Sequence, residues 1–196
     1  AMAIEDIQRH LAWTLQGIPQ DGDLLGAAGA PAHLTYWGDL QCPHCRDFVN
    51  HDLMELVHQE VRAGVVTLRY RPLETATRDR GEFVAQQAAA WAAGRQGRLW
   101  EFMETFHLSQ QEADSGYVTD RFLRAIADEI PELDLERWER DRRTDLTDHL
   151  AESERQARAA GVTGSPGLVL EADGRRRGPL RPTIHDLLDA VDELLA

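Results

Sequence analysis

The only two cysteines in the 196-residue sequence, Cys42 and Cys45, are separated by Pro43 and His44. Two thiols at this spacing can form and break an internal disulfide, or they can contribute ligands to a metal ion. A disulfide between them would close a very small loop and would add little stability by restricting the unfolded chain. The pair is therefore more consistent with redox chemistry than with a structural cross-link.

Zinc binding is the main alternative use of this pair. A structural zinc site needs four ligands, and the sequence contains neither a second CxxC nor an HxxxH motif. Shared ligation across a dimer and an inert thiol pair are weaker alternatives. Glu104 and His107 form one ExxH motif, whereas a di-iron bundle needs two. We predict that this motif lies on an ordinary helix surface, and that the protein uses no metal or cofactor besides its own disulfide.

The segments around the cysteines predict a βαβ unit. Residues 33–37 form a short, aromatic-rich apolar run that is typical of a buried strand. A helical pattern follows from Pro43 to residue 61, and residues 65–70 form a β-branched run that ends before Pro72. A strand, a helix and a strand within so short a segment are typical of two parallel strands joined by a crossover helix.

The rest of the sequence predicts helices, then a hairpin and a last helix. Residues 4–16 form an amphipathic helix, and residues 80–160 are divided by Gly and Pro into four or five helices. Strands are expected at 167–171 and 175–177, with a helix over 184–195. This order resembles an α/β thioredoxin fold with a large all-helical insertion between its βαβ half and its C-terminal hairpin and helix. We expect an N-terminal helix and lead-in (1–30), a thioredoxin-like domain (31–78 and 160–196) and an inserted helical domain (79–159).

The position of Cys42 at a strand-to-helix junction predicts a reactive thiol. A helix N-terminus presents unpaired N–H groups and the positive end of the helix dipole, and both favour a thiolate. We expect Cys42 to be the exposed nucleophile and Cys45, inside the first turn, to be the resolving thiol. His44 can add a hydrogen bond or positive charge near the Cys42 sulfur. A stabilised thiolate makes the disulfide form a better oxidant, so we expect an oxidising protein.

Overall composition limits the partners of the protein. The formal net charge is -13, and all 21 basic residues are arginines. An acidic surface of this kind argues against nucleic acid as a partner. No apolar run approaches the roughly 18 residues of a membrane span. The first five residues suggest the start of a helix and do not resemble a signal peptide, so the sequence alone leaves open whether the protein is cytosolic or a trimmed precursor.

Several segments are similar to one family. Residues 38–48, with the sequence GDLQCPHCRDF, resemble the active-site segment of DsbA-like thiol–disulfide oxidoreductases. Residues 17–20, 25–26, 99–102 and 115–120 are similar to actinobacterial members of that family, and residues 164–166 resemble its cis-proline loop. The resemblance covers nearly the whole chain from about residue 17 onward, and the CPHC segment carries most of its specificity.

The resemblance implies roles for individual residues. Cys42 would be the nucleophile, Cys45 the resolving thiol, and Pro166 the cis-proline that shapes a peptide groove. Ser165 would tune the redox potential and contact the client backbone. The implied protein is secreted or membrane-tethered, and exchanges disulfides with client thiols and with an unidentified redox partner. A reductase, an isomerase or a non-catalytic client-binding module of the same fold are the alternatives.

Two positions depart from the family pattern. Many thioredoxin-fold enzymes carry a buried acid six residues before the first cysteine, as proton acceptor for the second thiol, and this chain has Tyr36 there. Proton transfer at Cys45 would then use water, Asp39 or Glu74. Gly167 follows Pro166, where the family usually has Thr or a bulkier residue, so the shape of the groove is expected to differ.

Overall fold

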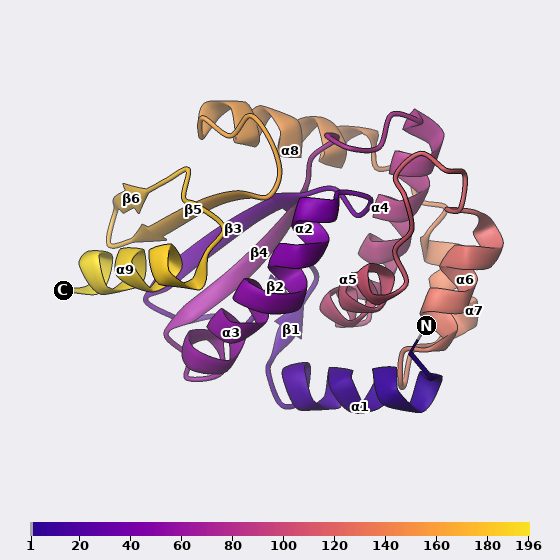
Figure 1. The fold of residues 1–196 in the computed structure, drawn as a ribbon, viewed down its shortest axis with the longest axis horizontal. Helices are drawn as coiled ribbons and strands as arrows, with labels where there is room; N and C mark the ends of the chain where they lie inside the picture. The colour runs from indigo at the N-terminus through magenta and orange to yellow at the C-terminus, as the bar shows by residue number, and fades with distance from the viewer. Residues whose placement is uncertain (1) are drawn as a thin grey trace.

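A six-stranded sheet with strand order β1-β2-β4-β3-β5-β6 forms the centre of the computed structural model, which describes residues 2–196 (Figure 1). The strands are β1 (Gln20–Asp21), β2 (Leu24–Leu25), β3 (Ala32–Gly38), β4 (Val66–Pro72), β5 (Gly167–Ala172) and β6 (Arg175–Arg177). β3 and β4 are parallel, whereas every other neighbouring pair is antiparallel. The predicted βαβ unit is therefore present at the centre of the sheet.

The helices are α1 (Ile4–Leu15), α2 (Pro43–Phe48), α3 (Met54–Leu56), α4 (Arg80–Gly94), α5 (Leu99–Leu108), α6 (Asp120–Asp128), α7 (Leu135–Asp141), α8 (Thr147–Ala159) and α9 (Ile184–Leu195). Two π-helical stretches, η1 (Val49–Leu53) and η2 (Val57–Val61), join α2 and α3 into one continuous helical segment. That segment is the predicted crossover helix between β3 and β4.

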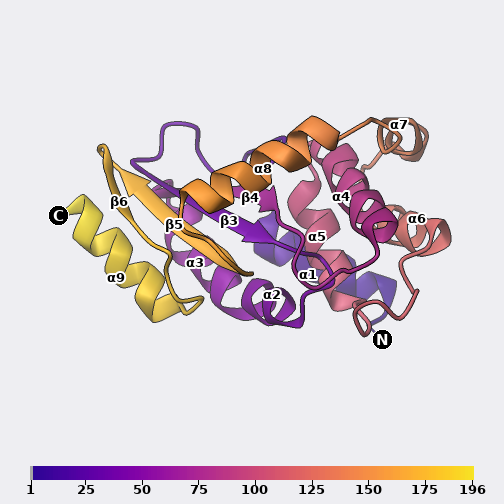
Figure 2. The same ribbon diagram turned by 90° about the horizontal axis from the view of Figure 1, so that it is seen from above.

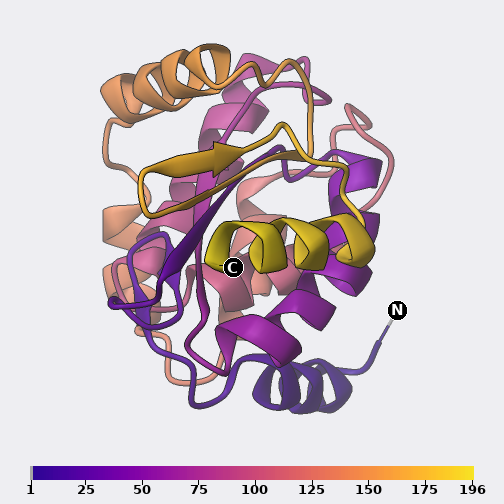
Figure 3. The ribbon, with the colours of Figure 1, turned by 90° about the vertical axis from the view of Figure 1, so that its left-hand side faces the viewer.

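Helices cover both faces of the sheet. α2, α3 and α9 lie on one face and α8 lies on the other (Figure 2), and α9 runs beside the β5–β6 hairpin (Figure 3). Side chains of β3 alternate between these faces, as expected for a strand. Tyr36 belongs to the main core, whereas Trp37 packs with Ala157 and Val169 under α8. The Trp37 indole donates a hydrogen bond to the backbone oxygen of Ser153 at 3.1 Å.

The order of elements agrees with the α/β thioredoxin fold expected from the sequence. Helices α4–α8 follow β4 and precede β5, and α4–α7 gather at one end of the sheet (Figure 1). The division into domains 1–30, 31–78 with 160–196, and 79–159 stays a prediction. In the described part of the chain, no helix is long and apolar enough to cross a bilayer.

Two short strands were not predicted. β1 and β2 have two residues each and form a small hairpin in which Gln20 pairs with Leu25. β2 then extends the sheet by pairing with β4, where Leu24 lies opposite Arg69. Strands this short carry no periodicity of their own. Their structure depends on the edge of β4, which is remote in sequence.

The prediction that Glu104 and His107 lie on a helix surface is wrong. Both side chains are buried, and α1, which packs against α5, covers Glu104. Glu104 accepts a hydrogen bond from the Thr14 hydroxyl at 3.2 Å, and its other oxygen lies 2.7 Å from His10 Nε2. Burial lowers the pKa of His107 to about 4, so this imidazole is neutral at neutral pH.

Candidate active site

The two cysteines lie at the start of α2, directly beyond the end of β3. Cys42 is the N-cap residue, and its Sγ accepts a hydrogen bond from the Cys45 backbone N–H at 3.4 Å. Pro43 is the first helical residue, where the missing proline N–H would have had no partner inside the helix. The sequence therefore directs the first sulfur toward the N–H groups that a helix start leaves free.

Both cysteines are reduced and buried. Cys45 is fully buried, and only 4% of the surface of Cys42 is exposed. Cys42 is thus the more accessible thiol, but the prediction that it is exposed is wrong for this form. The loop before β5 lies against it, since the Cys42 thiol donates to the backbone oxygen of Ser165 at 3.9 Å.

The environments of the two thiols move their pKa values in opposite directions. Hydrogen bonds from the Cys45 thiol, from Ser165 and from the backbone amides of Cys45 and His44 lower the pKa of Cys42 to about 6, against the opposing effect of burial. Burial first, and then the neighbouring Cys42, raise the pKa of Cys45 well above its ordinary value. At neutral pH the pair therefore carries one thiolate, on Cys42, and one thiol, on Cys45.

His44 acts on Cys42 through its backbone. Its amide is one of the groups that lower the pKa of Cys42, while its side chain and that of Pro43 are exposed. The predicted effect of the imidazole on the sulfur is a separate contribution and stays a prediction. The exposed Pro43 and His44 side chains form the surface next to the pair.

Ser165 lies beside Cys42, and Pro166 follows it in the same loop, while the roles of both residues stay predictions. The Ser165–Pro166 peptide bond is cis. The Ser165 hydroxyl lies 2.6 Å from the hydroxyl of Thr75, an exposed residue after β4 that sequence reasoning missed. Gly167 departs from the family pattern for a steric reason, because a Cβ atom there would lie 2.3 Å from Cγ1 of Val162.

Asp39 is buried and joins two loops of the site. Its carboxylate accepts six hydrogen bonds, which leaves it fully engaged. The donors are the backbone amides of Gln41, Thr75, Ala76 and Thr77 at 2.9–3.1 Å, the Thr77 hydroxyl at 2.6 Å and the Gln86 side-chain amide at 3.1 Å. Glu74 is exposed and forms an ion pair with Arg80. Among the described residues, neither carboxylate has a hydrogen bond to Cys45.

Gln41 ties the residue before the cysteine pair to the helical block. Its side-chain amide donates to Glu82 at 3.0 Å and to Gln86 at 3.1 Å, both on α4. Its side-chain oxygen accepts the Asp114 backbone N–H at 2.9 Å. These buried contacts join segments far apart in sequence, so no local pattern could have identified Gln41.

A groove of about 620 Å³ lies next to the start of α2. On one side it is bounded by Pro43 and Arg46 and on the other by the loop 110–114. Ala76 and Arg78, from the loop that Asp39 holds, complete it. The cysteine helix, the loop after β4 and the helical block therefore all line one open groove.

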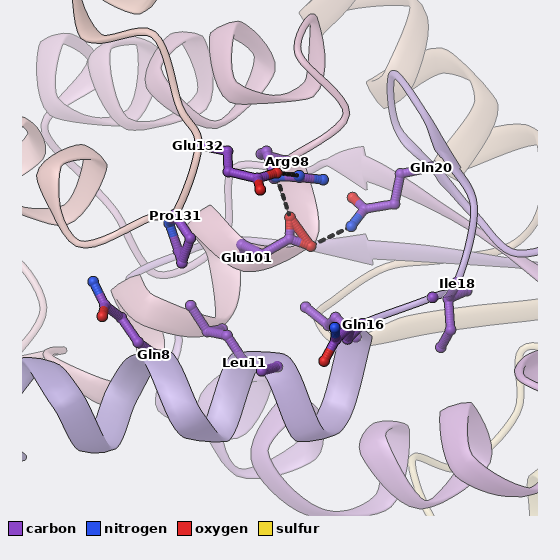
Figure 4. Close-up of a pocket in the computed structure, with 12 residues that line it drawn as sticks. Gln8, Leu11, Gln16, Ile18, Gln20, Arg98, Glu101, Pro131 and Glu132 are labelled. Carbon is purple, nitrogen blue, oxygen red and sulfur yellow. Dashed lines mark hydrogen bonds and ion pairs between the residues drawn. The ribbon is translucent and has the colours of Figure 1, made fainter.

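A second pocket, of about 270 Å³, lies between α1 and α5 and contains none of the site residues predicted from sequence (Figure 4). Glu101 points into it and is hydrogen-bonded by the side chain of Gln20. The nearest guanidinium nitrogen of Arg98 is 3.9 Å from the other Glu101 oxygen. Burial raises the pKa of Glu101 to about 7, so this carboxyl group titrates near neutral pH.

Comparison with known proteins agrees with this geometry. The family model described as Thioredoxin matches residues 20–192. The probable disulfide bond formation protein D of Bacillus anthracis is 23% identical over 173 residues, which cover 87% of this chain and 77% of that protein. The oxidised crystal structure of BdbD from Bacillus subtilis has a TM-score of 0.73 at 14% identity, covering 91% of this chain and 96% of its own.

The crystal structure of DsbA from Chlamydia trachomatis is also similar, with a TM-score of 0.73 at 16% identity over 88% of this chain and 91% of that one. The likeness in fold spans both the sheet and the helical block. The actinobacterial-type subgroup stays a prediction. With a CxxC pair at the start of α2 and a Ser–Pro loop against its first sulfur, the chain belongs to the thioredoxin family and is a DsbA-like thiol–disulfide oxidoreductase.

Proposed function

We propose that the protein is an oxidase that donates its Cys42–Cys45 disulfide to the thiols of client proteins. The observation that carries this proposal is the contrast between the two sulfurs. Hydrogen bonds lower the pKa of Cys42 to about 6, while burial raises the pKa of Cys45. A thiolate stabilised in the reduced form favours reduction of the pair, so its disulfide is a stronger oxidant.

The size of this effect follows from the ionisation of Cys42. With a pKa of about 6, about nine molecules in ten carry the thiolate at pH 7. Relative to a thiol that stays protonated, this stabilises the reduced form by about 1.4 kcal/mol, or about 30 mV for a two-electron couple. Ionisation of Cys42 alone therefore makes the reduction potential more positive by about 30 mV, a tenfold change in the exchange equilibrium.

In the proposed reaction, a client thiolate attacks Sγ of Cys42 and the Cys42–Cys45 bond breaks. The electron pair of that bond moves to Cys45, and a mixed disulfide joins the client to Cys42. A second client thiolate then attacks the client sulfur and releases Cys42 as a thiolate. Because a thiolate of low pKa is a good leaving group, this second step is fast. The client gains one disulfide, and the Cys42–Cys45 disulfide is reduced to two thiols.

The surface around Cys42 supports binding of an extended client segment. Ser165 lies against the sulfur, and its backbone oxygen accepts a hydrogen bond from the Cys42 thiol. The open groove beside Pro43 and Arg46 offers room for client side chains. We propose that the clients are reduced, unfolded proteins and that a separate, unidentified partner reoxidises the pair.

An oxidase of this kind is proposed to act outside the cytoplasm. Donated disulfides persist only in oxidising compartments, since cytosolic reductants remove them. The disulfide itself is the redox group, so the proposed reaction uses no further cofactor and no metal. The exposed Pro43 and His44 side chains and the open groove beside them are compatible with clients of many sequences.

The test is stoichiometric oxidation of a reduced, denatured client that has two cysteines. The oxidised protein should convert the client to its disulfide form, and Cys42→Ser should abolish this conversion. Cys45→Ser cannot form the internal disulfide, so this variant should also leave the client reduced. A wild-type protein that leaves the client reduced would contradict the proposal.

A further inference from the structure

Tyr36 occupies the strand position six residues before Cys42, where related enzymes carry a buried acid. Its side chain is fully buried in β3, and within residues 2–196 its hydroxyl has no hydrogen-bond partner of regular geometry. Leaving a buried hydroxyl without a partner costs about 1–3 kcal/mol. An orphaned hydroxyl at this position suggests a partner that forms only during the reaction.

The Tyr36 ring lies beneath the face of α2 that carries the second cysteine. Phe48 follows Cys45 by three residues and therefore shares its helix face, and the rings of Tyr36 and Phe48 are 5.4 Å apart. On the neighbouring strand, the Tyr70 ring is 5.5 Å away. The ring is thus fixed between β4 and the cysteine helix.

Gly38 provides the space for the Tyr36 hydroxyl. A Cβ atom at Gly38 would lie 2.4 Å from that oxygen, so any other residue would displace it. The hydroxyl therefore sits at the end of β3, next to the chain segment that leads into the cysteine pair. Burial, followed by the neighbouring Cys45, Tyr70 and Cys42, raises the pKa of Tyr36, and Tyr36 in turn lowers the pKa of Cys45 against the effects of burial and of Cys42.

We propose that the Tyr36 hydroxyl donates a hydrogen bond to the Cys45 sulfur while that sulfur carries negative charge, in place of a buried carboxyl group. Asp39 is engaged in six hydrogen bonds, and Glu74 is exposed beside Arg80, so neither carboxylate is free for this task. The inference rests on the exchange chemistry proposed above, although not on its direction.

The step is balanced without a proton from Tyr36. The incoming thiolate forms a bond to Cys42, the Cys42–Cys45 bond breaks, and Cys45 receives the electron pair. The Tyr36 O–H stabilises that charge until water protonates the sulfur. Burial raises the pKa of Tyr36 well above its ordinary value, which keeps the proton on this hydroxyl throughout.

This role has a specific kinetic consequence. The hydrogen bond is strong only while Cys45 is a thiolate, and it contributes little in the disulfide or the protonated thiol. Removing it should slow reduction and reoxidation by the same factor, which leaves the redox potential unchanged. A purely structural role for Tyr36 would not produce equal changes in both rates.

The test compares Tyr36→Phe with Tyr70→Phe, its register partner on β4. Rates of reduction by glutathione and of reoxidation by oxidised glutathione are measured for each variant, together with the potential and the stability to urea. For Tyr36→Phe we expect both rates to fall about tenfold, as for loss of one hydrogen bond to a charged group. The potential should match the wild type, and the stability should not fall, because Phe removes a buried hydroxyl that has no partner.

Tyr70→Phe should behave in the opposite way. Its hydroxyl donates to the Gly38 backbone oxygen at 3.1 Å and lies 3.0 Å from Gln87 Oε1, so its loss should lower stability and leave the rates within about twofold. Wild-type rates in Tyr36→Phe, or a change in only one direction of exchange, would overturn the inference. Failure of the wild type to exchange with glutathione at all would instead overturn the proposed function.

Discussion

The thiol of Cys42 lies 3.9 Å from the backbone oxygen of Ser165, although 123 positions separate the two residues in the chain. The Ser165 hydroxyl also helps to lower the pKa of Cys42. One loop therefore touches the reactive sulfur with both its backbone and a side chain. A loop placed in this way can influence the thiolate and contact a client at the same time.

Ser165→Ala should raise the pKa of Cys42 by about one unit, since a hydrogen bond to a charged group is worth roughly 1.5–3 kcal/mol. The measurement is the pH dependence of alkylation of the reduced protein by iodoacetamide. Ser115→Ala, in an exposed loop, serves as the control and should leave the midpoint unchanged. An unaltered midpoint in Ser165→Ala would show that the hydroxyl does not stabilise the thiolate.

The reduced wild-type protein should react at one thiol only. Alkylation of Cys42 should rise with pH around a midpoint of about 6, because the thiolate is the reactive form. Cys45 should stay unmodified over the same range, since burial raises its pKa and hides its sulfur. Mass spectrometry of the modified peptide distinguishes the two sites. A midpoint near that of a free cysteine would be inconsistent with the hydrogen bonds described for Cys42.

Asp39→Asn should destabilise the protein by about 3 kcal/mol. The substitution replaces one acceptor oxygen with an NH2 group that faces hydrogen-bond donors. Changing one member of a buried hydrogen-bond network is among the substitutions that lower the free energy of unfolding most. Urea unfolding of the oxidised form measures the effect. Asp47→Asn, at an exposed position on α2, should change stability by less than about 0.5 kcal/mol. Equal effects in the two variants would refute a structural role for the Asp39 network.

The parts of the site that could be predicted from sequence are those encoded locally. The CxxC spacing, the proline at the first helical position and the β-branched strand after it all lie within one short segment, so their patterns specify the βαβ unit. The roles of Ser165 and Pro166 came from resemblance instead. Their position against Cys42 depends on β5 pairing with β3, which no local pattern contains.

The parts that could not be predicted depend on contacts between distant segments. Asp39 looks like an ordinary loop acid until Thr77 and Gln86 surround it. Glu104 has the spacing of a helix-surface residue, yet α1 covers it. The exposure of Cys42 was misjudged for the same reason, because the covering Ser165 loop is remote in sequence.

Glu101→Gln should stabilise the protein above neutral pH. The folded-state pKa of Glu101 is about 7, raised from 4.5, so the folded state retains a proton that the unfolded state loses between these values. Stability therefore falls as pH rises through this window, and the ionised group remains a cost above it. Glutamine cannot ionise, so the advantage of the variant should grow to about 2–3 kcal/mol between about pH 5 and about pH 8.

Glu132→Gln is the matched control for this experiment. Glu132 lines the same pocket and pairs with Arg98 at 3.0 Å, but 80% of its side chain is exposed. Its substitution should shift stability little and by a similar amount at both pH values. Identical pH profiles for Glu101→Gln and the wild type would show that Glu101 titrates as an ordinary surface acid.

The redox equilibrium of the Cys42–Cys45 pair with glutathione is the most direct test of the central claim, that this pair is an oxidant. Trp37, on β3 five residues before Cys42, is a suitable fluorescence reporter. We predict a reduction potential more positive than about −220 mV, the upper end of the cytosolic glutathione range. A potential at or below that value would contradict the proposed oxidase and would indicate a reductase of the same fold.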